Sequence, residues 1–344
     1  MARPQPEAWG RFRLRGVPSN RQTPGEELGF TIVFVKIATT VVRGFCMGAA
    51  DIVPGVSGGT IALVFGIYER LIDNVRRGAR ALAALVRLDF PEFGRRLTNI
   101  EWSFLLPLAI GLLAAVVILS SLIEQLLNDH PEEMAGLFLG LVLGSIVVAW
   151  KLVRRPSGAT FATMFLVGVV TFVLLGLQSG PVADPPLLAY FGAGAIAICA
   201  MILPGISGSF LLLMMGMYAA VLGAIHDRNL MVLLVFTLGA TVGLALFSTA
   251  LGYLLDHYHD ELLAALIGLM LGSVRVLWPW PYGVGVISDV AGESISGTGL
   301  GMPTAAEWPV PTALAAGAFV VVVVLSRLAP TTDKSPNPNH QVHA

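Results

Sequence analysis

The chain has 344 residues, of which 55% are hydrophobic and 12% charged, and its formal net charge is −1. A soluble domain carries about 25% charged residues, so this composition excludes an ordinary soluble protein and predicts an all-α polytopic membrane protein. The small net charge gives no reason to expect nucleic acid as a partner.

The chain opens with a basic tail and two short apolar elements. Residues 1–29 carry five arginines and no early apolar core, which predicts a cytoplasmic tail and not a signal peptide. The elements 30–50 and 54–70 meet at the stretch DIVPGVSGGT, which spans residues 51–60 and includes the start of the second element. Glycine and proline release backbone groups that lipid cannot satisfy, so such a break is expected inside protein or against a water-filled cavity.

A basic segment at 70–98 separates these elements from the rest of the first half. Seven arginines alternate there with apolar residues, which favours an amphipathic segment on anionic lipid headgroups. The alternative is an ordinary positive-inside loop. Three further apolar elements at 103–127, 134–152 and 159–177 complete a first membrane repeat over 30–177.

The second half, 178–329, repeats the first. MILPGISGSF at 201–210 matches the first motif at an offset of 150, and residues 265–278 match 137–150 at an offset of 128. Two matches in the same order indicate a duplication. The apolar elements of this half span 187–202, 204–223, 231–255, 261–279 and 310–328, followed by a tail at 330–344 that is expected to be disordered.

The distribution of Lys and Arg predicts the orientation. The tail, segment 70–98 and residues 151–155 are basic, whereas 128–133, 178–186 and 280–309 contain neither residue. Cytoplasmic loops are the ones enriched in Lys and Arg. If the first two elements of each half form a re-entrant hairpin, three full spans remain per half, and an odd number inverts the second half. The sequence therefore predicts two inverted-topology repeats, a cytoplasmic N-terminus and an extracytoplasmic loop at 280–309.

The two Pro-Gly-x-Ser-Gly motifs are candidates for anion binding. Each precedes a new apolar helix, whose first N–H groups lack intrahelical acceptors, and glycines let a ligand approach the backbone. Hydroxyl groups add donors. The alternative is that the glycines only permit close packing and tight turns. The candidate phosphate-binding residues of the motifs are Gly55, Ser57, Gly58, Gly59, Thr60, Gly205, Ser207, Gly208 and Ser209.

Three charged residues in apolar surroundings extend this candidate site. Arg43 lies about two helical turns before Asp51, and charges at this depth are functional candidates. Arg43 is expected to pair either with a phosphate or with Asp51, which is also a candidate for coupling to H⁺ or Na⁺. Arg275 is a further candidate anion contact without a counterpart in the first repeat. The two cysteines and six histidines show no metal-ligand spacing, so neither a metal nor a cofactor is expected.

The stretch RGFCMGAADIVPGVSGGTIALVFGIYERLIDNV resembles the signature of the PopT-type polyprenyl-phosphate transporters, long a membrane family of unknown function. The similarity covers roughly residues 30–328 and includes the second motif. The resemblance implies a flippase in the bacterial inner membrane that returns undecaprenyl phosphate from the outer to the cytoplasmic leaflet for cell-wall synthesis. The anion site follows from the residues, whereas the lipid substrate follows from the resemblance.

Two other functions remain open at this point. Undecaprenyl-pyrophosphate phosphatases also have duplicated membrane halves and carry a PGxSRS motif, but here Gly58 or Gly208 stands in place of its arginine. Without that arginine and a paired acid and base, phosphoryl chemistry lacks charge stabilisation and proton transfer, so an enzyme is not expected. A channel or transporter for small anions would use similar loops. Neither the coupling ion, the preferred lipid chain length nor the oligomeric state follows from the sequence.

Overall fold

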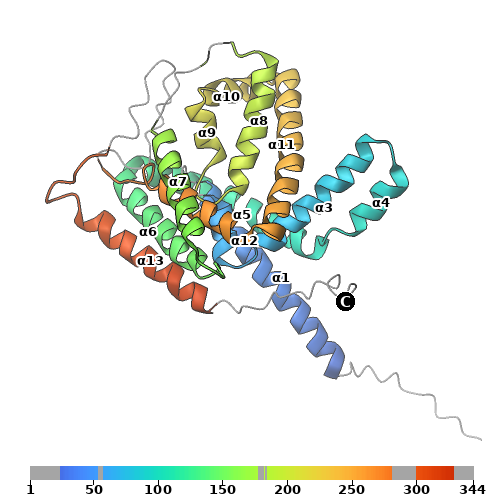
Figure 1. Cartoon of the computed structure of the whole chain (residues 1–344), viewed down its shortest axis with the longest axis horizontal. Helices are drawn as coiled ribbons and strands as arrows, with labels where there is room; N and C mark the ends of the chain where they lie inside the picture. Colours follow the sequence, from blue (N-terminus) through green and yellow to red (C-terminus); the bar gives the residue numbers. More distant parts are fainter. Residues whose placement is uncertain (1–23, 53–56, 177–181, 183, 281–299, 329–344) are drawn as a thin grey trace, which may run out of the picture.

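The computed structural model describes residues 24–52, 57–176, 182, 184–280 and 300–328, and every regular element in these ranges is an α-helix. This confirms the predicted all-α membrane class. The helices (Figure 1) are α1 (Pro24–Asp51), α2 (Gly58–Val64), α3 (Tyr68–Val86), α4 (Phe90–Thr98), α5 (Trp102–Asp129), α6 (Pro131–Trp150), α7 (Gly158–Leu174), α8 (Leu187–Ile202), α9 (Gly208–Met214), α10 (Tyr218–His226), α11 (Leu230–His257), α12 (His259–Ser273) and α13 (Pro309–Leu328).

Five of the described helices are long and apolar enough to cross a membrane, namely α1 from Val33 onward, α5, α6, α11 and α13. The short helices α9 and α10, taken together, are also long and apolar enough for a membrane span, but the chain bends by 109° between them. Helices α7 and α8 are apolar but shorter. The second half therefore contains a sharply bent pair of helices where the sequence predicts a broken element.

Glycines bring the helices together in parallel pairs. Gly44 of α1 lies against the backbone of Leu108 in α5, and Gly48 lies one turn further along against Leu112. The equivalent pair in the second half is α8 with α11, where a Cβ on Gly239 would lie 2.0 Å from the carbonyl oxygen of Phe191. Any side chain at these positions would push the helix backbones apart, so the small residues set the helix spacing.

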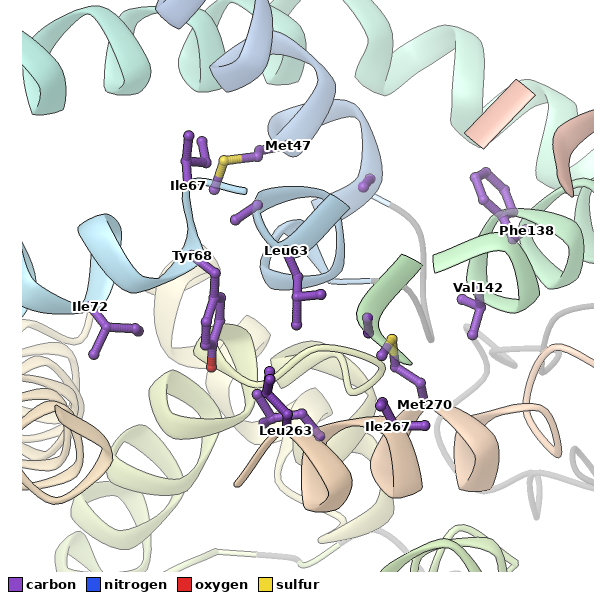
Figure 2. Packing of buried hydrophobic residues seen from close by; sticks show 14 of the residues in the cluster. Met47, Leu63, Ile67, Tyr68, Ile72, Phe138, Val142, Leu263, Ile267 and Met270 are labelled. Carbon is purple, nitrogen blue, oxygen red and sulfur yellow. The ribbon is translucent and has the colours of Figure 1, made fainter. Parts of the chain in front are cut away.

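The other two close pairs join one half to the other. Helix α6 packs along α13, and α7 packs along α12. The contacts of Gly140 with Ala315 and of Gly268 with Met164 show that glycines again mediate the approach. Each half thus contributes one helix to the partner half, so the two halves share a core. Figure 2 shows part of this core, in which Leu63 and Tyr68 of the first half point toward Leu263 of α12.

One end of the helical bundle is tied by polar contacts between the halves. Arg76 of α3 forms an ion pair with Asp256 of α11 at 2.8 Å. At the start of α12, Asp260 accepts hydrogen bonds from the backbone N–H groups of Arg154 and Arg155, just beyond the end of α6. Helix α12 therefore begins where α6 ends, and the two run in opposite directions although their sequences match. The inverted-topology repeats and their orientation in the membrane stay predictions.

The second apolar element of each half is divided where the sequence analysis expects one element. In place of 54–70 the structure has α2 and the start of α3, and in place of 204–223 it has α9 and α10. The divisions fall at Gly66 and Gly216, whose φ angles are +65° and +68°. Only glycine adopts this conformation without a steric cost. Gly66 and Gly216 occupy matching positions of the two repeats, and this match could have predicted the break from the sequence.

Helix boundaries differ from the prediction at two other places. Helix α12 ends at Ser273 and is followed by turns, whereas an apolar element over 261–279 was expected. The basic segment 70–98 forms two helices, α3 and α4, with a turn at Arg87 to Asp89 between them. Figure 1 shows this helical hairpin standing out to one side of the bundle.

Candidate functional site

A cavity of about 290 Å³ lies where the two Pro-Gly motifs meet. Its polar lining comes from both motifs, and its apolar lining comes mainly from α8 and α11. Asp51 is the one charged residue in this lining, within the part of the chain that the structure describes. The lining residues are Asp51, Ser57, Gly194, Ala197, Ile198, Met201, Ile206, Ser207, Gly208, Ser209, Leu212, Phe236 and Ala240.

In the first motif, the N–H groups from Gly58 to Thr60 are already bonded within the chain. Asp51, the last residue of α1, accepts a hydrogen bond of 2.5 Å from the N–H of Gly58 at the start of α2. Ser57 caps α2 by accepting from the N–H of Gly59, and the N–H of Thr60 donates to the carbonyl of Ser57. A carboxylate of the protein itself therefore holds the place that an anionic ligand was expected to take.

The second motif is left open. The hydroxyl of Ser207 does not cap α9 but lies 2.8 Å from the hydroxyl of Ser209. Among the described residues, the N–H groups of Gly208 and Ser209 have no acceptor. Position 201 of the second repeat holds Met201, where the first repeat has Asp51. This motif therefore offers unused donors to the cavity, and its exposed Ser209 lies at the cavity's edge.

Hydrogen bonds tie the two motifs to each other across the halves. The hydroxyl of Ser57 donates to the carbonyl oxygen of Met201 at 3.0 Å, and the N–H of Gly205 donates to the hydroxyl of Thr60 at 2.9 Å. A Cβ on Gly59 would lie 2.5 Å from the carbonyl oxygen of Ile202. Both motifs are thus in direct contact although about 150 residues separate them in the sequence.

The predicted site residues fall into three groups. Asp51, Ser57, Ser207, Gly208 and Ser209 line the cavity. Gly58, Gly59, Thr60 and Gly205 lie directly behind this lining, in the contacts within and between the motifs. Gly55 lies outside the described residues.

Arg43 and Arg275 do not line the cavity. Arg43 is half-buried in α1, eight residues before Asp51, which is a rise of about 12 Å along the helix. Neither an ion pair nor a hydrogen bond of its side chain is present among the described residues, so the alternative of an Arg43–Asp51 pair is not observed. A role in binding phosphate stays a prediction for Arg43.

Arg275 is held by the end of α7. Its guanidinium donates to the carbonyl oxygen of Phe172 at 3.4 Å and stacks over the Phe172 ring at 5.0 Å. A Cβ on Gly176 would lie only 2.3 Å from the guanidinium carbon. A cation at this position stabilises the free carbonyls that end a helix. The Nε of Arg275 is buried and has no hydrogen-bond partner among the described residues, so a role in anion binding stays a prediction for Arg275.

The apolar side of the cavity was not foreseen from the sequence. Phe236 and Ala240 of α11 face Gly194, Ala197 and Ile198 of α8. These residues look like ordinary membrane-helix residues, and only the packing of α8 on α11 selects them. The cavity combines a hydroxyl-rich end with an apolar wall, which suits a ligand with a polar head and an apolar chain. Among the described residues there is no group of His, Cys, Asp or Glu that could hold a metal ion.

Comparisons with known proteins agree with this chemistry. Residues 47–295 match a family model described as undecaprenyl phosphate translocase-like. The chain is 38% identical over 268 residues to a polyprenyl-phosphate transporter of Vibrio cholerae, covering 75% of this chain and 82% of that protein. It is 32% identical over 256 residues to a polyprenyl-phosphate transporter of Staphylococcus aureus, covering 70% and 85%. No solved structure matches the chain significantly.

Proposed function

The chain belongs to the undecaprenyl phosphate translocase-like family, and from this premise we propose that it transports polyprenyl phosphate across the cytoplasmic membrane. In this proposal the protein is a flippase without enzymatic activity. It accepts the lipid phosphate from the outer leaflet and returns it to the cytoplasmic leaflet for cell-envelope synthesis. The N-terminus and the α3–α4 hairpin lie on the cytoplasmic side.

The observation that carries the proposal is the cavity shared by the two motifs. The hydroxyls of Ser207 and Ser209 bond to each other, so one of them stays open as a donor beside the N–H groups of Gly208 and Ser209. Three open donors at one end suit the oxygens of a phosphate monoester. The wall formed by Phe236, Ala240 and Ile198 suits the first isoprene units of the lipid. Ser209 and Met201 are exposed at the edge of the cavity. The rest of the polyprenyl chain of the lipid can therefore stay in the bilayer.

Asp51 gives this site a second state. A phosphate bound at Ser207 would lie near the Asp51 carboxylate, and two like charges repel unless a proton or cation neutralises one of them. We therefore assign Asp51 as the coupling residue, which takes up H⁺ or Na⁺ when substrate binds. Loss of the bond between Asp51 and Gly58 would also free donors of the first motif, to which the phosphate then passes.

The proposed inverted repeats provide the change of side. The cavity lines the first part of α11, about 9 to 15 Å from the end of that helix at Leu230. In the predicted topology this is the outer half of the membrane. In the matching region of the first half, Gly48 stands where Ile198 lines the cavity, and Gly48 packs directly on Leu112 of α5. Exchange of these two arrangements would open the site to the cytoplasm.

Transport of labelled polyprenyl phosphate in proteoliposomes tests the proposal. Ser207→Ala and Ser209→Ala together remove both hydroxyls, and we expect transport to fall by at least about 100-fold, because each lost hydrogen bond to a charged group costs about 1.5–3 kcal/mol and every 1.4 kcal/mol is about a factor of ten. Ser248→Ala is the matched control, since Ser248 is buried in α11 and its hydroxyl bonds only within that helix.

Two outcomes would favour other functions. Rapid flux of chloride or inorganic phosphate without lipid transport would identify an anion channel or small-anion transporter. Release of phosphate from a polyprenyl pyrophosphate would identify a phosphatase. Wild-type transport in the double serine variant, with both proteins equally folded, would show that the phosphate does not bind at the second motif.

Asp51→Asn tests the coupling. The amide retains the acceptor for the N–H of Gly58 but carries no charge and cannot titrate. We expect transport by this variant to lose its dependence on pH or on a Na⁺ gradient, measured across a pH series with and without Na⁺. If the variant keeps the wild-type dependence on both, Asp51 has a structural role only.

A further inference from the structure

The α3–α4 hairpin carries cations that the chain itself leaves unpaired. Between residues 68 and 98 there are seven arginines and four carboxylates. Arg76 is paired with Asp256, and Arg95 and Arg96 are paired with Glu92. The side chains of Arg80 and Arg87 are exposed and form no ion pair or hydrogen bond among the described residues. With seven arginines against four carboxylates, the hairpin presents a net positive surface.

The surroundings of Arg80 add to this surplus of positive charge. Arg96 reaches across from α4 and donates to the backbone carbonyl of Arg80 at 3.3 Å. Partial burial lowers the pKa of the Arg80 guanidinium, and the neighbouring charges of Arg76 and Arg96 lower it further, while Asp73 and Asp256 offset part of this effect. Like charges gathered in this way destabilise the free hairpin slightly and favour binding of an anion.

The tip of the hairpin is apolar as well as basic. Leu88 is 73% exposed and Phe90 is 62% exposed, directly beside Arg87. Leu88 has a φ of +59°, a conformation that costs a residue with a Cβ about 1–2 kcal/mol. A glycine would form this turn more easily, so the turn itself gives no reason for a leucine. An exposed apolar pair beside arginines is typical of segments that insert shallowly into a membrane surface.

The fold places the hairpin at the level of the membrane surface. Trp102, 43% exposed, begins the span α5 only four residues after α4 ends, and its indole N–H donates to the carbonyl of Leu97. Four residues reach at most about 14 Å. Tryptophan is enriched at the membrane interface. On the other arm of the hairpin, Arg76 of α3 pairs with Asp256 near the end of the span α11. The hairpin is thus attached to the start of α5 and to the end of α11, and we expect both to lie near the same membrane surface.

We propose that the α3–α4 hairpin is a docking surface for anionic phospholipid headgroups, with Arg80 and Arg87 contacting phosphates and Leu88 and Phe90 entering the bilayer surface. The proposal does not depend on what the cavity binds. The occupant is lipid because the surface combines unpaired cations with exposed apolar side chains next to two span ends. Docking would hold α3, and through the Arg76–Asp256 pair also α11, at a defined height in the membrane.

A fluorescent label on the full-length protein tests this docking. Gly94 of α4 has open space around it, so Gly94→Cys is a suitable labelling site once Cys46 and Cys199 are replaced by alanine. The labelled protein is reconstituted in phosphatidylcholine alone or in a mixture with phosphatidylglycerol. We expect a blue-shifted emission, quenched by shallow nitroxide lipids, in the anionic vesicles, and weakening of both signals at high salt.

Three variants separate docking from folding. The double variant Arg80→Gln/Arg87→Gln should lower the ratio of docked to free hairpin by about 30-fold, since each arginine contributes about a fivefold preference for an anionic surface. Arg154→Gln/Arg155→Gln, the same charge change at exposed positions outside the hairpin, should leave the ratio unchanged. Leu88→Gly should weaken the quenching although it relieves the backbone.

Opposite results would overturn the proposal. Equal emission in neutral and anionic vesicles would exclude headgroup binding. The same conclusion would follow if the Arg154/Arg155 variant lowered the docked fraction as much as the Arg80/Arg87 variant. Quenching that follows the density of protein in the vesicles and not their lipid charge would assign the surface to a second copy of the chain. None of these readouts uses transport, so their failure is distinct from failure of the proposed function.

Discussion

Asp51 is the residue on which the two motifs differ most. It ends α1, bonds to the N–H of Gly58 and lines the cavity, whereas the second repeat has Met201 at the matching position. The first motif is consequently closed by a carboxylate of the chain, and the second is open. A duplicated site with one closed and one open copy is what transfer of an anion from one motif to the other requires.

Arg43 is the residue whose role the structure makes testable. Because it neither pairs with Asp51 nor lines the cavity, a simple charge balance with Asp51 does not account for it. We expect Arg43→Ala to abolish transport while the protein still folds, and Arg43→Lys to retain part of the activity, because a point charge replaces the bidentate guanidinium. Transport assays and size-exclusion profiles measure the two effects.

Lys36→Ala is the control for that prediction, since it removes a cation from an exposed position of the same helix. Normal transport by Arg43→Ala would remove Arg43 from the phosphate path. In that case the donors of the motifs would have to neutralise the substrate without an arginine.

Gly66 and Gly216 divide the second element of each half into two helices. A Cβ on Gly66 would meet no other atom within 4 Å, so the only cost of a side chain there is its positive φ. The same turn recurs at Gly216, with hydrogen bonds in the same places. The two halves therefore share the same backbone turn after each motif, at Gly66 and at Gly216.

Gly66→Ala should lower the free energy of unfolding by about 1–2 kcal/mol, because alanine adopts this φ at a steric cost. Gly223→Ala is the opposite control. Gly223 is helical and also has open space around it, so alanine there should stabilise the protein by about 0.5–1 kcal/mol. Thermal unfolding in detergent measures both, and a neutral Gly66→Ala would show that this turn does not persist.

The Arg76–Asp256 pair links α3 of one half to α11 of the other. Arg76 packs against Gly252, where any side chain would collide with it. If the two halves move apart to release substrate, this contact must break. A bismaleimide cross-link between Arg76→Cys and Asp256→Cys should therefore stop lipid transport.

The control for this cross-link joins Arg70→Cys to Glu101→Cys, a pair within the first half whose native side chains also form an ion pair. That cross-link should leave transport unchanged. Full transport by the Arg76/Asp256 cross-linked protein would show that α3 and α11 move as one unit.

At the scale of the whole molecule, the halves are interlocked. Each gives one helix to the other, as α6 packs with α13 and α12 with α7. The two exchanged pairs are equivalent under the duplication, and both are parallel. We propose from this exchange that equivalent loops of the two halves lie on opposite sides of the membrane.

Cysteine labelling from each side of the membrane tests that topology. Met302→Cys, at a position that is 90% exposed before α13, should react with an impermeant thiol reagent from outside the cell. Arg155→Cys, in the loop after α6, should react only after the membrane is opened. Labelling of both from the same side would contradict the inverted arrangement and the cytoplasmic position of the hairpin.

The membrane class, the two matching motifs and most helix ranges could be predicted from the sequence alone, because apolar runs, proline and glycine act locally. The family resemblance carried by residues such as Asp51 to Thr60 was also confirmed. Three contacts are visible only in the folded chain: Asp51 bonds to Gly58 and not to Arg43, Arg275 donates to Phe172 near the end of α7, and α8 and α11 form the apolar wall of the cavity. These contacts join residues by helix packing, and packing depends on the depth and rotation of helices, which periodicity in one chain does not encode.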